Sequence, residues 1–317
     1  MLELRVKKCL ARLAAANSVA MPCPRLLPQM RDYVESLLLA ENLPPTPHHI
    51  KMLIEDFSQM VALSNAGKPV IYKKRNTLSL MFDVCALQSE MRLENPDDLV
   101  LGYTQSMMGF LLFKPEPRKI GMVGLGGGSL AKFCYRYLPT ASVEVAEIDP
   151  QVIELRQQFL IPDDDERLHV RCMDGADFVR EADGRFDVLM VDGFDKSGQP
   201  PQLCSQRFYD DCYQALTPDG IMVVNLLADV LETDIYIERM QRAFNDAVVI
   251  IDALDSLNKI LFACKGDTWN LDQSILKRRV RQLDLLHPMI VSLTAQNILL
   301  KRRAANSLEG LHPADAV

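Results

Sequence analysis

The sequence predicts an α/β protein with a doubly wound, mostly parallel β-sheet, and three observations support that fold class. Short apolar runs alternate with helical segments from Arg118 to about residue 266. The first apolar run enters a glycine-rich turn that opens a helix, and the second ends in an acidic residue, Glu147. Alternation of this kind is typical of βαβ units, in which helices cover both faces of a parallel sheet.

The composition of the 317 residues excludes several classes of protein. Hydrophobic residues make up 48% and charged residues 24%, as is usual for globular domains. The formal net charge of -7 gives no attraction for phosphate backbones, so we expect no nucleic-acid partner, whereas a cationic substrate would be attracted. No apolar run reaches the roughly 18 residues of a membrane helix, so we expect no membrane association.

The eight cysteines and five histidines are scattered along the chain. No C-x-x-C pair occurs, and several cysteines fall in apolar strands or helices, which favours reduced structural thiols and a cytoplasmic location. The only cluster of histidines, His48-His49, places two adjacent side chains on different faces of a helix, so we expect no metal site.

The pattern changes three times along the chain. The first segment is helical, and Thr46-Pro47 is a typical helix start because proline is favoured at the first helical position. The next segment holds the short alternating runs KPVIYKK, NTLSLMFD and ALQSEM, which predict a small antiparallel sheet. We therefore expect four parts: a helical N-terminal extension over 1–67, a β-region over 68–97, a Rossmann-like catalytic domain over 98–266, and C-terminal helices and tail over 267–317.

The catalytic domain is expected to begin with a helix over 98–113 and then to alternate. The predicted strands are KIGMVGLG, SVEVAEI, RLHVRC, GRFDVLMVD and GIMVVNLL, with helices over 129–138 and 150–159. DAVVIIDA and KILFACK follow with no helix between them, which predicts an antiparallel hairpin at the sheet edge. Residues 270–303 are expected to be helical, and their basic cluster KRRVRQ is interpreted as a solvated helix face.

The strongest chemical signal is the turn in MVGLGGGSLAKF, which carries Gly124, Gly126 and Gly127. Glycine allows a tight turn and a close approach of the backbone to a ligand. The helix that follows offers unpaired N–H groups and positive potential. A glycine-rich turn is weak evidence alone, but here it lies between a strand and a helix, where a nucleotide or nucleoside would bind.

Two acidic residues follow the next two strands. Glu147 comes 23 residues after Gly124, the position at which doubly wound folds bind ribose hydroxyls; the alternative is a solvated strand end. Asp174 follows the third strand and could accept a hydrogen bond from an adenine amino group. It is also a good helix N-cap, and the two roles are compatible.

Three features favour S-adenosylmethionine or a relative over a dinucleotide. The glycines lack the G-x-G-x-x-G order, an acidic residue marks the third strand, and the sheet ends in a hairpin rather than a second mononucleotide-binding half. We therefore expect an S-adenosylmethionine-dependent methyltransferase-like Rossmann fold, with a small N-terminal β-region and extra N-terminal helices.

Two further carboxylates, Asp192 and Asp195, follow the fourth strand, where α/β sheets bind ligands. The segment KSGQPPQL after them has the composition of a mobile covering loop. The structural alternatives are a helix cap for Asp192 and a turn-forming side chain for Asp195.

Residues from about Val70 to Leu226 resemble the spermidine synthase family, the polyamine aminopropyltransferases. The resemblance rests on four stretches: LGYTQSMMGFLLFKPEPRKIGMVGLGGGSL, VAEIDPQVIEL, residues 173–176, and VDGFDKSGQPPQL. The chain looks closest to a divergent, GLGGGSL-bearing branch of that family.

The resemblance implies roles for nine residues. The co-substrate, decarboxylated S-adenosylmethionine, would be held by the glycine turn, by the acids after strands two and three, and by the glutamine that ends the small β-region. These positions are Gly124, Gly126, Gly127, Glu147, Asp174 and Gln88. Asp192 would orient and deprotonate the attacking amine, such as putrescine. Asp195 would help to hold the aminopropyl group or the amine, and Tyr103 would line the amine site. The resemblance also implies a homodimer acting in polyamine biosynthesis.

The chain departs from the family pattern at three positions. Ser129 or a neighbouring glycine stands where the family usually has an aspartate in the glycine turn, and Thr104-Gln105 replaces the His-Glu pair after the tyrosine. Charges that would hold an ammonium group are therefore neutral, which is expected to weaken diamine binding.

Three functions stay open from the sequence. The first is aminopropyl transfer from decarboxylated S-adenosylmethionine to an amine, with no metal. The second is a methyltransferase that uses S-adenosylmethionine itself, which Ser129 fits better because it removes a negative charge near the carboxylate end of that molecule. The third is a nucleoside-binding homologue without catalysis, against which the pair Asp192 and Asp195 argues.

Overall fold

A computed structural model of the chain describes residues 35, 46–48, 50–52, 54–55, 68–83, 86–195, 198–228, 230–254, 256, 258–266, 272–289 and 291–309. The chain divides into two compact units, residues 1–90 and residues 91–317. Most of the helical segment expected over 1–67 lies outside the described residues; among those described, Pro47 is helical directly after Thr46, as expected.

A three-stranded sheet forms the described part of the first unit. Its strands are β1 (Val70–Lys74), β2 (Thr77–Asp83) and β3 (Ala86–Arg92), in the order β1-β2-β3. Strands β1 and β2 pair antiparallel across a tight turn at 75–76. The alternation in the sequence predicted these strands because it places apolar side chains on one face, where Leu78 and Leu80 are buried.

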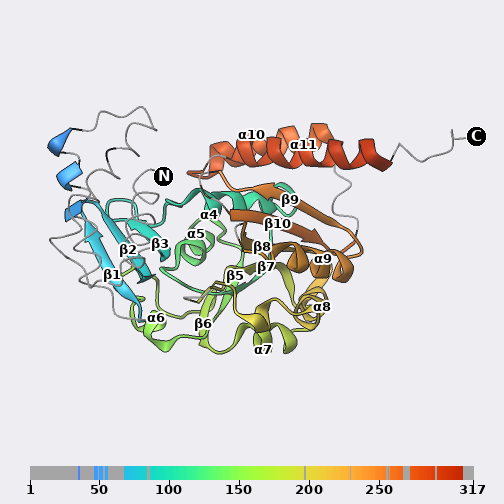
Figure 1. Cartoon of the computed structure of the whole chain (residues 1–317). Helices are drawn as coiled ribbons and strands as arrows, with labels where there is room; N and C mark the ends of the chain where they lie inside the picture. Colours follow the sequence, from blue (N-terminus) through green and yellow to red (C-terminus); the bar gives the residue numbers. More distant parts are fainter. Residues whose placement is uncertain are drawn as a thin grey trace, which may run out of the picture. The chain divides into compact units, whose positions relative to one another are not determined.

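A seven-stranded sheet forms the centre of the second unit (Figure 1). Its strands are β4 (Lys119–Val123), β5 (Ser142–Glu147), β6 (Leu168–Cys172), β7 (Phe186–Val191), β8 (Leu216–Leu227), β9 (Val248–Asp252) and β10 (Asn258–Cys264). The order is β6-β5-β4-β7-β8-β10-β9. The first five strands run parallel, whereas β10 pairs antiparallel with both β8 and β9, so the predicted edge hairpin is confirmed.

The strand order reverses next to β4, and this reversal fixes where a ligand is expected. From β4 the chain first moves outward to β5 and β6, then returns to the other side of β4 with β7 and β8. Sheets of this kind bind ligands outside the carboxyl ends of the strands at such a switch point. The residues that follow β4 and β7 therefore flank the expected site.

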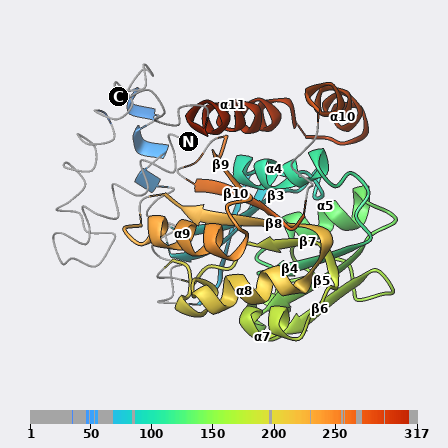
Figure 2. The same ribbon diagram turned by 90° about the vertical axis from the view of Figure 1, so that its right-hand side faces the viewer.

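Helices cover both faces of this sheet. They are α4 (Gly102–Met107), η1 (Met108–Leu112), α5 (Ser129–Tyr137), α6 (Pro150–Glu154), α7 (Gly175–Arg180), η2 (Pro201–Leu203), α8 (Gln206–Ala215), α9 (Thr233–Ala243), α10 (Gln273–Leu286) and α11 (Val291–Glu309). Figures 1 and 2 show α7, α8 and α9 on one face, with α4, α10 and α11 on the opposite one. The doubly wound fold class is confirmed.

Three predicted helices differ from those observed. The helix expected over 98–113 is α4 followed by the 3-10 helix η1. The helix expected over 150–159 ends at Glu154, since the next turns form bonds between residues three apart, such as the Leu155 N–H to the Val152 carbonyl, and Leu160 adopts a positive φ of 55°. The helical C-terminal segment is two helices, and the described residues between them, 287–289, contain Pro288.

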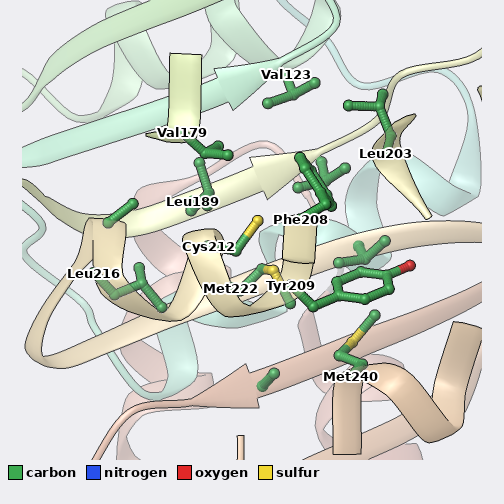
Figure 3. Packing of buried hydrophobic residues seen from close by; sticks show 14 of the residues in the cluster. Val123, Val179, Leu189, Leu203, Phe208, Tyr209, Cys212, Leu216, Met222 and Met240 are labelled. Carbon is green, nitrogen blue, oxygen red and sulfur yellow. The ribbon is translucent and has the colours of Figure 1, made fainter. Parts of the chain in front are cut away.

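The main apolar core lies between the sheet and helices α7, α8 and α9. Figure 3 shows Val123 and Leu189 of the sheet facing Phe208 and Tyr209 of α8, with Met240 of α9 beyond them. Burial of this much apolar surface fixes α8 and α9 on the sheet. Leu203, in η2, is buried in this core.

One charged residue is buried on the other side of the sheet. Lys132 of α5 is 1% exposed, and its ammonium donates to the carbonyl of Phe159 at 2.7 Å and to the sulfur of Met91 at 3.0 Å. Burial lowers the pKa of Lys132 to about 8, partly opposed by the negative charge of Asp97. This ammonium ties α5 to Met91 at the end of β3 and to Phe159 in the turns that follow α6.

Candidate active site

The carboxyl ends of four adjacent strands are joined by backbone hydrogen bonds. The N–H of Gly124 donates to the carbonyl of Ala146 at 2.8 Å, and the N–H of Asp192 donates to the carbonyl of Val123 at 2.9 Å. The N–H of Met173 likewise donates to the carbonyl of Glu147 at 3.0 Å. The residues that leave β4, β5, β6 and β7 therefore begin at the same edge of the sheet.

The glycine turn between β4 and α5 requires glycine at two positions for different reasons. Gly124 has φ +95°, and a Cβ atom there would lie 2.3 Å from the backbone oxygen of Asp192. Gly128 has φ +68° and caps α5 in the left-handed conformation, where a Cβ would meet Ile161 at 2.5 Å. Gly126 also has a positive φ, 53°, and Gly127 follows it in the turn. An L-residue would strain this backbone or push the strand ends apart.

Glu147 holds the glycine turn in place. Its carboxylate is buried, at 8% exposure, and accepts hydrogen bonds from the N–H of Leu125 at 2.8 Å and from the N–H of Asp149 at 2.9 Å. A carboxylate offers about four acceptor positions, so two remain for ligand hydroxyls. The side chain predicted to bind ribose therefore also shapes the turn that precedes α5.

Asp174 caps α7 and contacts the segment after β7. One carboxylate oxygen accepts from the N–H of Ala176 at 2.7 Å, which confirms the predicted N-cap. The other accepts from the side-chain amide of Gln202 at 3.3 Å. Gln202 lies in η2, so this acid connects the end of β6 to the segment that follows Asp192.

Asp192 receives a hydrogen bond on each carboxylate oxygen. The hydroxyl of Tyr103, on α4, donates to one oxygen at 3.2 Å, and the side-chain amide of Asn225, on β8, donates to the other at 2.8 Å. Burial raises the pKa of Asp192, and these two donors oppose the rise. Burial and the nearby carboxylate also raise the pKa of Tyr103, so the phenol stays protonated as a donor.

A half-buried carboxylate in this setting can exchange a proton with a ligand. Desolvation brings its pKa closer to neutrality, which improves it as a general base, while the two hydrogen bonds fix its direction. Asp192 is not a helix cap, the structural alternative considered for it, because α8 begins only at Gln206.

Asp195 and Gln88 are the remaining residues predicted for the site. Asp195 is exposed and forms reciprocal backbone hydrogen bonds with Gly198, which makes a short turn. Gln88 is half-buried on β3, in the unit over 1–90. The structure thus brings together Tyr103 with Asp192, and Glu147 with the glycine turn, through hydrogen bonds.

The residues that depart from the family pattern bond to the backbone. The hydroxyl of Thr104 donates to the carbonyl of Leu101 at 2.6 Å, and the amide of Gln105 donates to the carbonyl of Leu99 at 2.9 Å. Ser129 is the first residue of α5 and is half-buried. Thr104 and Gln105 therefore stabilise the start of α4, which carries Tyr103.

Three polar residues near Asp192 were missed by the sequence reasoning. Asn225 lies near the C-terminal end of β8 and is 2% exposed, and its side chain also accepts a hydrogen bond from Asn258. The amide of Gln199 donates to the backbone oxygen of Asn225 at 3.0 Å. The signal for Asn225 is its occurrence inside the apolar run GIMVVNLL, because a buried amide needs partners.

Within the described residues, no three histidine, cysteine, aspartate or glutamate side chains form a group that could hold a metal ion. Nor does any helix in the described part of the chain have both the length and the apolar character needed to span a membrane.

Comparisons with known proteins agree with the fold. Residues 101–255 match the family model described as the spermine/spermidine synthase domain. The chain is 34% identical over 215 residues to a polyamine aminopropyltransferase of Chromobacterium violaceum, which covers 68% of this chain and 82% of that protein. A polyamine aminopropyltransferase of Neisseria meningitidis is 33% identical over 234 residues, which are 72% of this chain and 89% of that protein.

A solved structure shares the fold. A spermidine synthase in complex with the transition state analogue AdoDATO superposes with a TM-score of 0.60 at 20% identity, over 78% of this chain and 87% of that one. The predicted methyltransferase-like arrangement of the sheet is therefore confirmed.

Proposed function

Because this chain belongs to the spermine/spermidine synthase family, we propose that it transfers an aminopropyl group from decarboxylated S-adenosylmethionine to an amine such as putrescine. The observation that carries the proposal is the half-buried carboxylate of Asp192, which Tyr103 and Asn225 orient at the switch point of the sheet. The backbone oxygen of Asp192 lies beside Gly124, where a nucleoside is expected. The proposal places the protein in polyamine biosynthesis.

The nucleoside end of the co-substrate is assigned to the glycine turn and its neighbours. Glu147 has acceptor positions left for the two ribose hydroxyls after its bonds to Leu125 and Asp149. Asp174 would accept a hydrogen bond from the adenine amino group in place of the amide of Gln202. Gly124, Gly126 and Gly127 would let the backbone approach the co-substrate, and Gln88 would contact the nucleoside.

Asp192 would supply the base that the reaction needs. An alkylammonium ion has a pKa of about 10 in water, so it must lose a proton before its nitrogen can attack. The carboxylate accepts that proton. The nitrogen lone pair then forms a bond to the carbon beside the sulfonium, and the carbon–sulfur bond breaks with its electrons on sulfur. The products are a thioether and a secondary ammonium ion, so charge is conserved.

Tyr103 and Asp195 would complete the amine side. The Tyr103 phenol donates a hydrogen bond to Asp192, and it would line the space where the amine enters. Asp195 would help to hold the aminopropyl group or the amine by its negative charge. Much of the acceleration would come from aligning the two bound substrates, since the displacement needs no covalent intermediate.

Binding and turnover measurements on the full chain test this proposal. We expect decarboxylated S-adenosylmethionine and methylthioadenosine to bind more tightly in calorimetry than S-adenosylmethionine and S-adenosylhomocysteine. Mass spectrometry should detect the aminopropylated product when putrescine is added. Asp192→Asn is the matched control, and it should keep the nucleoside affinity within about threefold while product formation falls at least about 100-fold.

Two outcomes contradict the proposal. Tighter binding of S-adenosylmethionine than of its decarboxylated form, with methyl transfer to an acceptor, would identify a methyltransferase. Nucleoside binding without product from putrescine or another tested amine would identify a binding protein without transfer activity. The curated relatives, named polyamine aminopropyltransferases, favour the aminopropyl donor.

A cytoplasmic location and a homodimer complete the proposal. The described cysteines Cys134, Cys172, Cys204 and Cys212 have free thiols, which supports a reducing compartment. Exposed leucines on α10 and α11, among them Leu285 and Leu300, offer apolar surface for a second copy. Light scattering of the purified chain should give twice the mass of 35.7 kDa.

A further inference from the structure

A chain of side-chain amides runs from β10 to the carboxylate of Asp192. Asn258 begins β10, and its amide nitrogen donates to the side-chain oxygen of Asn225 at 2.7 Å. The amide nitrogen of Asn225 then donates to Asp192 at 2.8 Å. The antiparallel register pairs Asn225 with Ile260, two residues along β10 from Asn258. The two amides therefore link Asp192 to a strand at the far side of β8.

The first amide decides which way the second one faces. A side-chain amide has a donor end and an acceptor end, and turning it by half a revolution exchanges them. Because Asn258 donates to the oxygen of Asn225, the nitrogen of Asn225 is left to face Asp192. In the opposite orientation two NH₂ groups would face each other, and a carbonyl oxygen would face a carboxylate. Both contacts would be unfavourable in a buried site.

The backbone contact of Asn225 does not impose this choice. Gln199 donates to the main-chain oxygen of Asn225, which leaves the side chain free to turn. The N–H of Asn258 donates to the hydroxyl of Ser256 at 3.4 Å, so the start of β10 is itself anchored. The side chain of Asn258 is thus the contact that orients the Asn225 amide.

We propose that Asn258 is a positioning residue for the transfer reaction: acting through Asn225, it keeps a hydrogen-bond donor against Asp192 and so favours the ionised carboxylate. The inference rests on the proposed function, in which that carboxylate accepts the proton of the amine. Asn258 does not touch the reacting atoms.

Few other groups can set the charge of Asp192. On the α4 side, the titratable group that reaches its carboxylate is Tyr103, a donor that stays protonated. On the β5 side, Glu147 directs both oxygens to backbone N–H groups of Leu125 and Asp149. The end of β4 contributes glycine and main chain. Among the described residues, the contact to the Asp192 carboxylate that can change is therefore the one from the Asn225 side chain, because its amide can turn.

The substitution Asn258→Asp tests the proposal most sharply. A carboxylate at 258 offers only acceptors, so the Asn225 amide should turn its nitrogen toward it and present its oxygen to Asp192. The Asp192 carboxyl would then need its proton to make that hydrogen bond. We expect the acid limb of the kcat/KM profile for putrescine to move up by about one pH unit, with little change in the KM for decarboxylated S-adenosylmethionine.

Ser256→Asp is the matched control, since the Ser256 hydroxyl accepts a hydrogen bond from the backbone N–H of Asn258, whereas the described side-chain hydrogen bonds of Asn225 are with Asn258 and Asp192. It adds the same charge at the same end of β10, and we expect its acid limb to stay within about 0.3 pH units of the unsubstituted chain. Equal shifts in both variants, or no shift in Asn258→Asp, would overturn the proposal. If Asn258→Asp does not fold, Asn258→Ala replaces it, with a smaller upward shift expected and no shift contradicting the proposal.

A second readout separates this inference from the proposed function. The difference in melting temperature between a protein and its Asp192→Asn variant depends on pH through the Asp192 carboxyl alone, whether or not the protein turns over. Asn258→Asp should move the midpoint of that difference to higher pH by a similar amount. A shifted midpoint without any turnover would support the role of Asn258 and refute only aminopropyl transfer.

Discussion

The backbone oxygen of Asp192 lies where a side chain on Gly124 would have to go, because a Cβ atom there would be 2.3 Å away from it. The turn assigned to the nucleoside and the residue assigned as the base are therefore in direct contact. A change at one of them is transmitted to the other through the main chain.

The first prediction concerns this contact. Gly124→Ala should lower the free energy of unfolding by more than Gly184→Ala, measured by urea denaturation. Both positions have positive φ, +95° and +54°, but a Cβ at Gly184 meets nothing within 4 Å. Gly184→Ala should cost about 1–3 kcal/mol from backbone strain, and Gly124→Ala about 1–3 kcal/mol more from crowding. Equal losses of unfolding free energy in the two variants would show that the contact between Gly124 and Asp192 relaxes without an energetic cost.

The second prediction concerns Glu147. Glu147→Gln removes the negative charge and turns one acceptor into a donor that faces a backbone N–H, either of Leu125 or of Asp149. Charge-assisted hydrogen bonds contribute about 1.5–3 kcal/mol, so the Kd for methylthioadenosine should rise at least about tenfold in calorimetry. Glu154→Gln, on the exposed side of α6, is the matched control and should leave the Kd unchanged. An unaltered Kd in Glu147→Gln would refute the ribose assignment.

The third prediction concerns the pH dependence of stability at Asp192. Its pKa is raised in the folded state, so the folded protein binds this proton more tightly than the unfolded chain does. The contribution of Asp192 to stability is therefore fully present below the unfolded pKa of about 3.9 and is lost as the pH rises through the folded pKa. The Asp192→Asn variant lacks this carboxyl group, so it does not lose that stability as the pH rises.

We therefore expect the Asp192→Asn variant to melt at a higher temperature than the unsubstituted chain at pH 7. The difference should close as the pH falls toward 4, as followed by circular dichroism. A lower melting temperature at pH 7 would mean that the bonds from Tyr103 and Asn225 outweigh the desolvation of the carboxylate.

The fourth prediction concerns Lys132, whose pKa is lowered to about 8. Between this value and about 10.4, the unfolded chain binds a proton that the folded protein has released, so this residue makes stability rise with pH in that window. Lys132→Met should abolish the rise, measured as the difference in unfolding free energy between the two proteins at pH 7.5 and pH 10. An identical pH dependence in both proteins would contradict the assignment of a buried, desolvated ammonium.

Much of the site could be predicted because parallel strands bring their carboxyl ends to one edge. Glu147 and Asp192 each follow an apolar run, so their positions at that edge follow from the strand pattern alone. The glycine turn could also be predicted from the local sequence pattern, because a strand and a helix flank it. Tyr103 came from the family resemblance, since 89 residues separate it from Asp192 and no local pattern joins them.

Other features depended on tertiary contacts that a local pattern does not carry. The pairing of Asn225 with Asn258 depends on the antiparallel register between β8 and β10. The neutral residues Thr104 and Gln105 were expected to act by their missing charge, yet each bonds to a backbone carbonyl at the start of α4. The early end of α6 likewise involves the positive φ of Leu160, which apolar spacing does not reveal.

The pairing of Cys172 with Glu147 on neighbouring strands makes a spectroscopic reporter available. Cys172 is exposed, whereas the other cysteines that the structure describes are buried, so a maleimide dye should attach here once Cys9, Cys23 and Cys85 are changed to serine. A fluorophore at this point would sit one strand away from the acid assigned to ribose. Its emission would then report occupancy of that end of the sheet in real time, without any turnover.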